Sequence, residues 1–512
     1  MTERSRRDWT RSLLRAGPAP FFFLGLTAWA YAAALTVTDG DFVYPLDDPY
    51  IHLAVAENLT QGHYGLNLAE PSSPASSVVW PGLLALGLIA GAGGWIALAL
   101  NAVLGVWALT MALRLGDAVF EDANRSALGM LAALGAVLVL NLPALALIGM
   151  EHVLQIGLTL LAWLGLVRVA RGATPAWPLL MALAIGPLVR YENLALTVPA
   201  CAYLVALGHW RAALGALGVA VVGLAAFSGF LAMLGLPLLP TSVLAKTSAD
   251  GTPALLANLA LPTGWFLVLL TATVGGAFVL AARRGVPRRM LGLGGVALAT
   301  AALHLGAGRL GWFARYEIYV VAGLFVALLV LRPPASQPRR RRAYAFAFVL
   351  AAAALTVRHG SLVAFVPDAS RDIHEQHVQM HRFVADHWQA PIAVNDIGRV
   401  AFENDRVVLD LWGLASPTAL AEANNPDPSW MDALAMQHGV EAAMLYAPSF
   451  AALPASWVPV ADLQLSHAAS VVPHNTVTFF ARTPEAESRL RSVLPAFGEA
   501  LPRGTLLRFR AP

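Results

Sequence analysis

The sequence predicts a polytopic α-helical membrane protein with about eleven transmembrane helices and a C-terminal extracytoplasmic α/β domain. Of its 512 residues, 57% are hydrophobic and 13% are charged, against roughly 25% charged in an ordinary soluble domain. Many windows of about 18 or more apolar residues follow one another, and each is long enough to cross a bilayer as a helix. The net charge of +3 does not indicate nucleic-acid binding, because the basic residues cluster at helix ends.

The apolar pattern covers residues 1–366 and gives way to a more polar tail at 367–512. Within this tail, "DASRDIHEQHVQMHRFVADHW" predicts a helix and four other segments predict strands. The strand-like segments are "IAVNDIGRVAF", "RVVLDLWGL", "EAAMLYAP" and "TVTFFART". We therefore expect a membrane domain followed by a soluble α/β domain.

The start of the chain has a basic segment before an apolar run at 19–37. This order is typical of a cleaved signal peptide and equally of a first spanning helix. The run is long enough to span a bilayer, which favours an uncleaved helix.

Lys and Arg residues concentrate in short cytoplasmic loops of membrane proteins. In this chain basic loops alternate with loops almost free of Lys and Arg, and residues 39–113 contain neither. We expect a cytoplasmic N-terminus, an outward first loop at 39–94 and an outward tail. The alternation requires that residues 78–94 lie on or dip into the membrane surface. The basic loops are the N-terminus and residues 114–125, 168–175, 208–212, 282–289 and 332–343.

Two adjacent carboxylates, Asp47 and Asp48, lie in the outward first loop, within "YPLDDPYIHLAVAENLTQG". The simplest interpretation is a solvated acidic pair that caps a surface helix. His52 follows on the same predicted helix, either as a substrate contact or as a packed or solvated histidine. Charged groups at a membrane boundary are unfavourable unless solvated or paired, so the choice depends on the other outward charges.

Further charged residues are expected at the outward ends of other helices. They come from several loops and include the only lysine of the chain. Glu151 begins a helix, where the helix dipole favours an acid. The set comprises Glu151, Arg190, Glu192, Lys246, Arg309, Arg315 and the neighbouring Tyr316.

Carboxylates and cations on one membrane face suit sugar transfer from a lipid phosphate. Guanidinium or ammonium groups stabilise the negative charge that grows on a departing phosphate. A carboxylate on the opposite side of the anomeric carbon removes a proton from the acceptor hydroxyl. One base without an enzyme nucleophile gives inversion. A phosphate leaving group needs little protonation, so the second carboxyl group of inverting hydrolases is not required.

Six segments resemble motifs of the GT-C superfamily, integral-membrane glycosyltransferases that use polyprenyl-phosphate sugars. They are most similar to the DD-motif branch, which includes mycobacterial terminal arabinofuranosyltransferases. The segments lie in order between about residues 20 and 420 and are "LDDPYIHLAVAENLTQG", "GMEHVL", "RYEN", "PLLPTSVLAKT", "ARYEIYV" and "IAVNDIGRVAFENDRVVLDLWGLASP".

The resemblance implies an inverting enzyme of the bacterial inner membrane. It implies transfer of one pentose or hexose from a polyprenyl-phosphate donor to an extracytoplasmic glycan or lipid acceptor. It makes Asp47 the catalytic base, with Asp48 as the alternative, and implies no metal or other cofactor, although a divalent cation is left open. It assigns substrate contacts to Glu151, Arg190, Glu192, Lys246, Arg315 and Tyr316, with His52 as a branch-specific contact.

Two other classes of function are open. In a transporter or flippase of lipid-linked substrates, the same charges would line a substrate path, but the sequence lacks the internal repeat that many transporters have. A non-catalytic relative would bind glycans through its tail.

Two polar features of the tail have structural interpretations. His374, His377 and His381 stand at helical spacing, so a metal site is conceivable. No fourth ligand is evident, and a polar helix face is favoured. Asp396 and Gly398, in "NDIG", are interpreted as a turn at the end of a strand.

Overall fold

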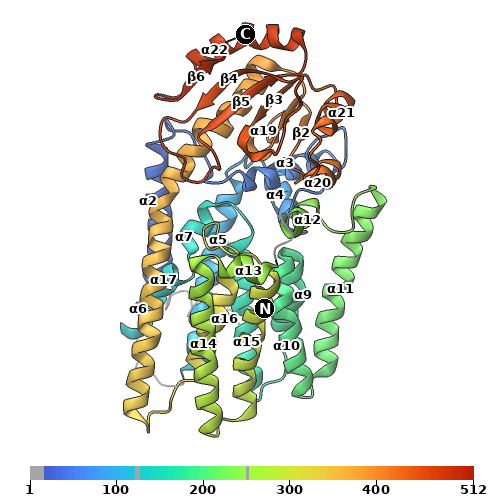
Figure 1. Cartoon of the computed structure of the whole chain (residues 1–512). Coiled ribbons are helices and arrows are strands. Elements are labelled where there is room, and N and C mark those ends of the chain that lie inside the picture. Colours follow the sequence, from blue (N-terminus) through green and yellow to red (C-terminus); the bar gives the residue numbers. More distant parts are fainter. Residues whose placement is uncertain (1–16, 121–126, 249–252, 512) are drawn as a thin grey trace. The chain divides into compact units, whose positions relative to one another are not determined.

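The computed structural model describes residues 17–120, 127–248 and 253–511, without the side chains of 127–132 and 246–248. The chain divides into two compact units (Figure 1). Unit 1 takes its residues from Met1–Trp29, Leu98–Ala226 and Asp250–Ala364. Unit 2 takes its residues from Ala30–Ala97, Phe227–Ala249 and Phe365–Pro512.

Unit 1 is built from α-helices. Within it α8 packs against α9 and α16, and α15 packs against α10, α14 and α16. The helices α2 (Ala19–Leu35), α5 (Ile96–Val119), α11 (Trp210–Met233) and α17 (Pro338–Ile373) cross the division between the units. The remaining helices are α6 (Ala127–Val139), α7 (Leu142–Leu147), α8 (His152–Ala170), α9 (Trp177–Val189), η1 (Tyr191–Asn193), α10 (Leu194–Ala206), α13 (Ala254–Leu259), α14 (Pro262–Arg283), α15 (Arg288–Ala307) and α16 (Ile318–Val330).

Among the described residues, six helices are long and apolar enough to cross a membrane, and four more apolar helices have 10–17 residues. The chain is therefore a multi-pass helical membrane protein, as the composition predicts. The number of about eleven spans stays a prediction. The helix at Trp80–Ile89 has 10 residues and is about 15 Å long at 1.5 Å per residue. This is half of the roughly 30 Å hydrocarbon core, in agreement with the expectation that residues 78–94 do not span.

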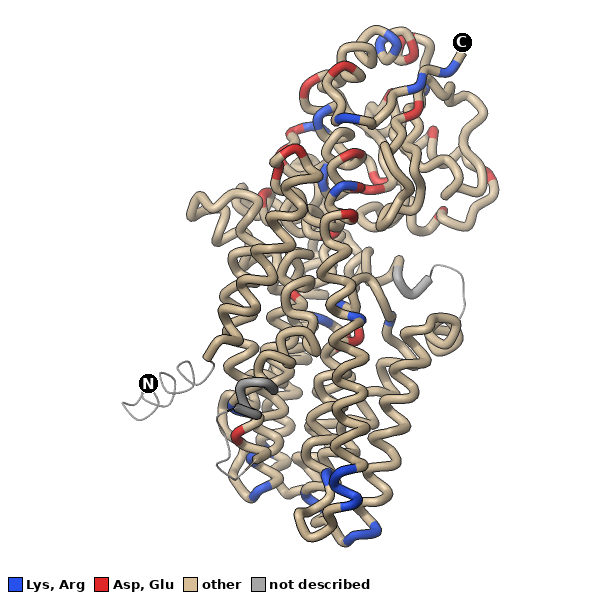
Figure 2. Tube along the Cα trace, turned by 90° about the vertical axis from the view of Figure 1, so that its left-hand side faces the viewer, with Lys and Arg blue, Asp and Glu red and all other residues tan. Residues whose placement is uncertain are grey.

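Many Lys and Arg positions of the helical part lie near one end of its helices, and a few lie midway along them (Figure 2). Arg171, after α8, and Arg332, after α16, both donate hydrogen bonds to the carbonyl of Val119, at 3.2 and 3.0 Å. Arg284, at the end of α14, donates to the carbonyl of Leu331 at 2.9 Å. Basic loops far apart in the sequence thus meet at one end of this unit, as the alternation of loops requires. Which side of a membrane this end faces stays a prediction.

Unit 2 contains a six-stranded sheet with the order β2-β1-β3-β5-β4-β6. β1 pairs in parallel with β2 and β3, with Ile392 opposite Val408 and Ala442; the other pairs are antiparallel. Every residue of β1, β2 and β3 is buried, as expected for strands covered on both faces. The strands are β1 (Ile392–Val394), β2 (Val408–Asp410), β3 (Ala442–Leu445), β4 (Val458–Gln464), β5 (Thr476–Ala481) and β6 (Leu506–Phe509).

The helices of unit 2 come from three separate stretches of the chain. Residues 39–94 contribute α3 (Asp48–Thr60) and α4 (Trp80–Ile89), and α12 (Thr241–Ser248) comes from the middle of the chain. From the tail come η2 (His374–Val378), α18 (Gln379–Arg382), η3 (Phe383–Trp388), α19 (Gly398–Ala401), α20 (Pro417–Glu422), α21 (Ser429–Gln437), η4 (Ala447–Ser449) and α22 (Pro484–Glu499).

One expectation for the tail needs correction. The helix predicted near residue 370 is present as the end of one continuous 51-residue helix, Pro338–Trp388, and the domain boundary expected between 366 and 367 stays a prediction. The strand predicted over "IAVNDIGRVAF" is confirmed only for Ile392–Val394, and Gly398–Ala401 is helical instead. A helix turn forms there because the N–H groups of its first residues have a carboxylate partner, described next.

Candidate functional site

Asp47 lies at the N-terminus of α3 but does not cap that helix with its side chain. Its carboxylate instead accepts two backbone N–H groups at the start of α19, from Gly398 to Oδ2 at 2.6 Å and from Arg399 to Oδ1 at 2.8 Å. The first N–H groups of a helix have no partner within the helix, so a carboxylate stabilises them. The capping interpretation is therefore half right: Asp47 caps a helix that lies in the tail.

Gly398 is required by the close approach of this carboxylate. A Cβ atom at position 398 would lie 2.2 Å from the carbonyl oxygen of Asp47 and 2.8 Å from its Oδ2. Any side chain would therefore displace Asp47 or open the start of α19. The sequence indicated a turn here, but not the residue against which the glycine packs.

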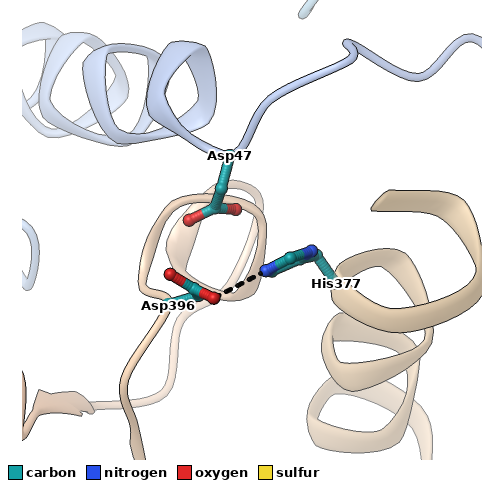
Figure 3. A group of neighbouring side chains, drawn as sticks. All are labelled: Asp47, His377 and Asp396. Atoms are coloured by element: carbon teal, nitrogen blue, oxygen red, sulfur yellow. Dashed lines mark hydrogen bonds and ion pairs between the residues drawn. The ribbon is translucent and has the colours of Figure 1, made fainter. Parts of the chain in front are cut away.

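His377 and Asp396 complete a cluster with Asp47 inside unit 2 (Figure 3). His377 belongs to the π-helical turn η2 and is only 1% exposed. Its Nε2 lies 3.1 Å from Oδ2 of Asp396, which follows β1. One ligand atom from each of the three residues lies within 4.8 Å of the other two. All three side chains point toward one another (Figure 3).

Opposing effects act on the pKa of the Asp47 carboxyl group. Burial raises the pKa of its carboxyl group to about 6, and the neighbouring Asp396 raises this pKa further, whereas His377 and the two backbone N–H groups oppose the rise. Two carboxylates and one imidazole are thus held together in a poorly solvated place. Such a group can hold a divalent cation or pass a proton.

The three histidines of the tail helix, His374, His377 and His381, do not share one site. His374 lies 3.6 Å from Asp41, whereas only His377 joins the cluster with Asp47 among the described residues. All three histidines are buried, including His381. The helix face is polar, as expected, but unit 2 covers it.

The other candidates of unit 2 lie on two helices. Asp48 is the first residue of α3 and is half-buried, and His52, on the same helix, is buried. Lys246 belongs to α12, but its side chain lies outside the described part of the structure.

Five predicted residues of unit 1 form a second, separate cluster. The guanidinium of Arg190 bonds to Oε1 of Glu151 at 2.8 Å and, through Nε, to Oε2 of Glu192 at 3.1 Å. It lies over the Tyr316 ring at 5.5 Å. Arg315 lies over the same ring at 4.9 Å and donates to the Tyr316 hydroxyl at 2.9 Å. These five residues thus lie together, and their role as substrate contacts stays a prediction.

The two arginines differ in their partners. Arg190 makes ion pairs with Glu151 and Glu192, so its charge is balanced within the protein. Arg315 donates hydrogen bonds to the Tyr316 hydroxyl and to the sulfur of Met150. Glu192 is the more accessible acid, because its side chain is 26% exposed and that of Glu151 is fully buried.

Arg315 follows an unusual backbone segment. Trp312, Phe313 and Ala314 all have positive φ angles, 48°, 64° and 57°. Each residue costs about 1–2 kcal/mol in this conformation, so the surroundings must hold it in place. One such contact is the 2.6 Å hydrogen bond from the Asn141 side chain to the carbonyl of Phe313. Sequence reasoning missed this turn, because none of the three residues is a glycine.

One segment of the tail matches a known family model. Residues 371–480 match a family model described as a domain of unknown function, DUF8728. No curated protein matches the chain.

Two solved structures from Archaeoglobus fulgidus are similar to most of the chain. One is an oligosaccharyltransferase in complex with Zn and sulfate, with 14% identity and a TM-score of 0.46, over 89% of this chain and 73% of that one. The other is the oligosaccharyltransferase AglB in complex with an inhibitory peptide and a dolichol-phosphate, with 12% identity and a TM-score of 0.44, over 96% and 77%. This similarity is distant.

Proposed function

We propose that the protein is an inverting glycosyltransferase that moves one pentose or hexose from a polyprenyl-phosphate donor to an extracytoplasmic glycan or lipid acceptor. The observation that carries the proposal is the carboxylate pair at the start of α3 in a multi-pass membrane protein. Asp47 of this pair is fixed by backbone N–H groups of the tail. The sequence resemblance to the GT-C superfamily supports the same reaction.

In the proposed reaction a carboxylate of the pair takes the proton of an acceptor hydroxyl. The acceptor oxygen forms a bond to the anomeric carbon, and the bond from that carbon to the phosphate oxygen breaks. The electron pair leaves with the polyprenyl phosphate. One displacement without an enzyme intermediate inverts the anomeric configuration. A positioned base contributes roughly 10²–10⁴-fold to such a step.

The cluster of unit 1 is proposed to bind the donor. Arg315 is assigned to the lipid phosphate, because a cation stabilises charge on the leaving oxygen. Arg190 already pairs with two carboxylates and is assigned to holding Glu151, Glu192 and the Tyr316 ring in place. The partly exposed Glu192 is assigned to a sugar hydroxyl.

The test uses purified full-length protein, a panel of polyprenyl-phosphate pentoses and hexoses, and glycan or lipid acceptors. We expect one donor to be used, and Asp47→Asn and Asp48→Asn each to lower the rate by about 100-fold or more. Asp405→Asn is the control, because Asp405 is an exposed carboxylate of the same unit. Undiminished transfer by both variants of the pair would contradict the assignment of the base.

A further inference from the structure

We infer that Asp47, His377 and Asp396 form a binding site for a divalent cation, for which Mn²⁺ and Zn²⁺ are the fitting ions. The site lies entirely within unit 2. Its catalytic consequence rests on the proposed function, whereas cation binding does not.

The spacing of the ligand atoms suits one ion. Nε2 of His377 and Oδ2 of Asp396 are 3.1 Å apart. Two ligands bound at about 2.0–2.2 Å to one cation are themselves separated by about 3.0–3.4 Å. The carboxylate of Asp47 supplies a third ligand atom within 4.8 Å of the others, so a small inward shift completes a three-ligand site.

The ligand types narrow the choice of ion. Imidazole suits Zn²⁺ and other transition metals, whereas carboxylates suit Mn²⁺, Mg²⁺ and Ca²⁺. One imidazole with two carboxylates therefore favours a borderline ion over Mg²⁺ or Ca²⁺. Three protein ligands leave at least one position open, which is the pattern of catalytic rather than structural metal sites.

The surroundings hold the ligands in place without filling the site. Asp47 is oriented by the N–H groups of Gly398 and Arg399, and ligating carboxylates are commonly held by such bonds. His377 projects from a π-helical turn, a deformation that is frequent at functional sites.

The charges of the three clustered side chains also favour a bound cation. The two carboxylates of the cluster repel each other, and one imidazole compensates at most one of them. The guanidinium of Arg399 lies over the Tyr50 ring at 5.6 Å and donates to the carbonyl of Phe402 at 2.8 Å. A divalent cation would neutralise both acids.

A cluster without an ion is the competing explanation. In it His377 and Asp396 form a simple pair and Asp47 serves only as the cap of α19. If the cation binds instead, Asp47 is a ligand, and the proton of the acceptor passes to Asp48, the neighbouring carboxylate. A cation held by Asp47, His377 and Asp396 would supply Lewis-acid stabilisation of the charge on the acceptor oxygen.

The experiment measures binding by the purified full-length protein after removal of metals with a chelator. Mn²⁺ and Zn²⁺ are titrated by calorimetry, with Mg²⁺ and Ca²⁺ for comparison, and the melting temperature is recorded with and without each ion. We expect one Mn²⁺ or Zn²⁺ per chain and a higher melting temperature. His377→Ala and Asp396→Asn should each weaken binding by more than about 100-fold. His381→Ala, one helical turn further along, should bind as the unmodified protein does.

The melting temperature of each variant is compared with that of its own metal-free form. If His377→Ala does not fold, the test rests on Asp396→Asn, which keeps the shape of the side chain. No stoichiometric binding, or full binding by both variants, would overturn the cation site. Sugar transfer by a protein that binds no cation would reject the site and leave the proposed function standing. Cation binding without transfer of any sugar would support the cation site and reject the proposed function.

Discussion

Asp47 accepts the backbone N–H of Gly398 at 2.6 Å, across 351 positions of the sequence. This bond belongs to a unit in which the loop at residues 39–94 packs against the tail, since α3 also contacts α19. The loop and the tail are therefore one folded unit. The acidic pair consequently depends on the tail for its position, whatever chemistry it performs.

Replacing Gly398 with Ala should destabilise unit 2 and displace Asp47. The added Cβ would lie 2.2 Å from the carbonyl oxygen of Asp47, and overpacking of this kind costs about 1–3 kcal/mol. We expect a lower melting temperature and weaker cation binding. Gly82→Ala is the matched control, because a Cβ at this position of α4 meets no atom within 4 Å. Equal melting temperatures for the two variants would show that Gly398 is not constrained.

Replacing Arg190 with Met should destabilise unit 1. Glu151 is fully buried beside it, and removing one partner of a buried ion pair costs about 3–5 kcal/mol because a charge is left uncompensated. Thermal unfolding in detergent measures the loss, and Arg211→Met, at an exposed site, provides the comparison. Adding Glu151→Gln should restore part of the lost stability. A double variant no more stable than Arg190→Met would argue against this pairing.

Arg315 should matter more for the donor than the hydroxyl of Tyr316 does. Arg315→Lys keeps the charge but loses the planar fork and much of the stacking on the ring, so we expect the KM for the polyprenyl-phosphate donor to rise about tenfold. Tyr316→Phe keeps the ring and loses the hydroxyl with its 2.9 Å hydrogen bond from Arg315, and a smaller rise is expected. Steady-state kinetics with the donor varied give both values. The opposite ranking would remove Arg315 from the phosphate contacts.

Asp410 should be a structural acid of the tail. Its carboxylate accepts backbone N–H groups from Trp412, Gly413 and Ala415 at 2.8, 3.1 and 2.5 Å. Asp410→Asn places an amide N–H₂ among these donors, and each charged hydrogen bond is worth about 1.5–3 kcal/mol. A clear fall in melting temperature is expected, compared with Asp405→Asn at an exposed position. An unchanged melting temperature would show that these bonds contribute little.

Sequence patterns identified the broad class because it depends on local composition. Long apolar windows fix the membrane helices, and runs of buried residues at 392–394 and 442–445 mark the central strands. The helix at Pro484–Glu499 was not predicted from the sequence, although this segment has a helical pattern. Thr483 caps it through the N–H of Ala486, and Ala486, Leu490 and Leu494 form a buried stripe at intervals of four. The helical signal was present there.

The cluster of Asp47, His377 and Asp396 could not be derived from spacing. Asp47 is more than 300 positions from the other two, and no local periodicity joins a loop acid to a distant helix and a strand end. His377 looked like its neighbours His374 and His381, and only the fold distinguishes it. In unit 1 the grouping of Glu151 and Arg190 was predicted from motif resemblance, whereas their ion pair became apparent only from the structure.

The most direct test of the central claim compares transfer with transport. The purified protein is reconstituted in vesicles that contain a polyprenyl-phosphate sugar and an acceptor, and both product formation and movement of the lipid-linked sugar are followed. The account predicts a new glycoside of inverted anomeric configuration, one polyprenyl phosphate released per glycoside, and loss of both in the double variant Asp47→Asn, Asp48→Asn. Movement of the lipid-linked sugar across the bilayer with no glycoside formed would contradict it.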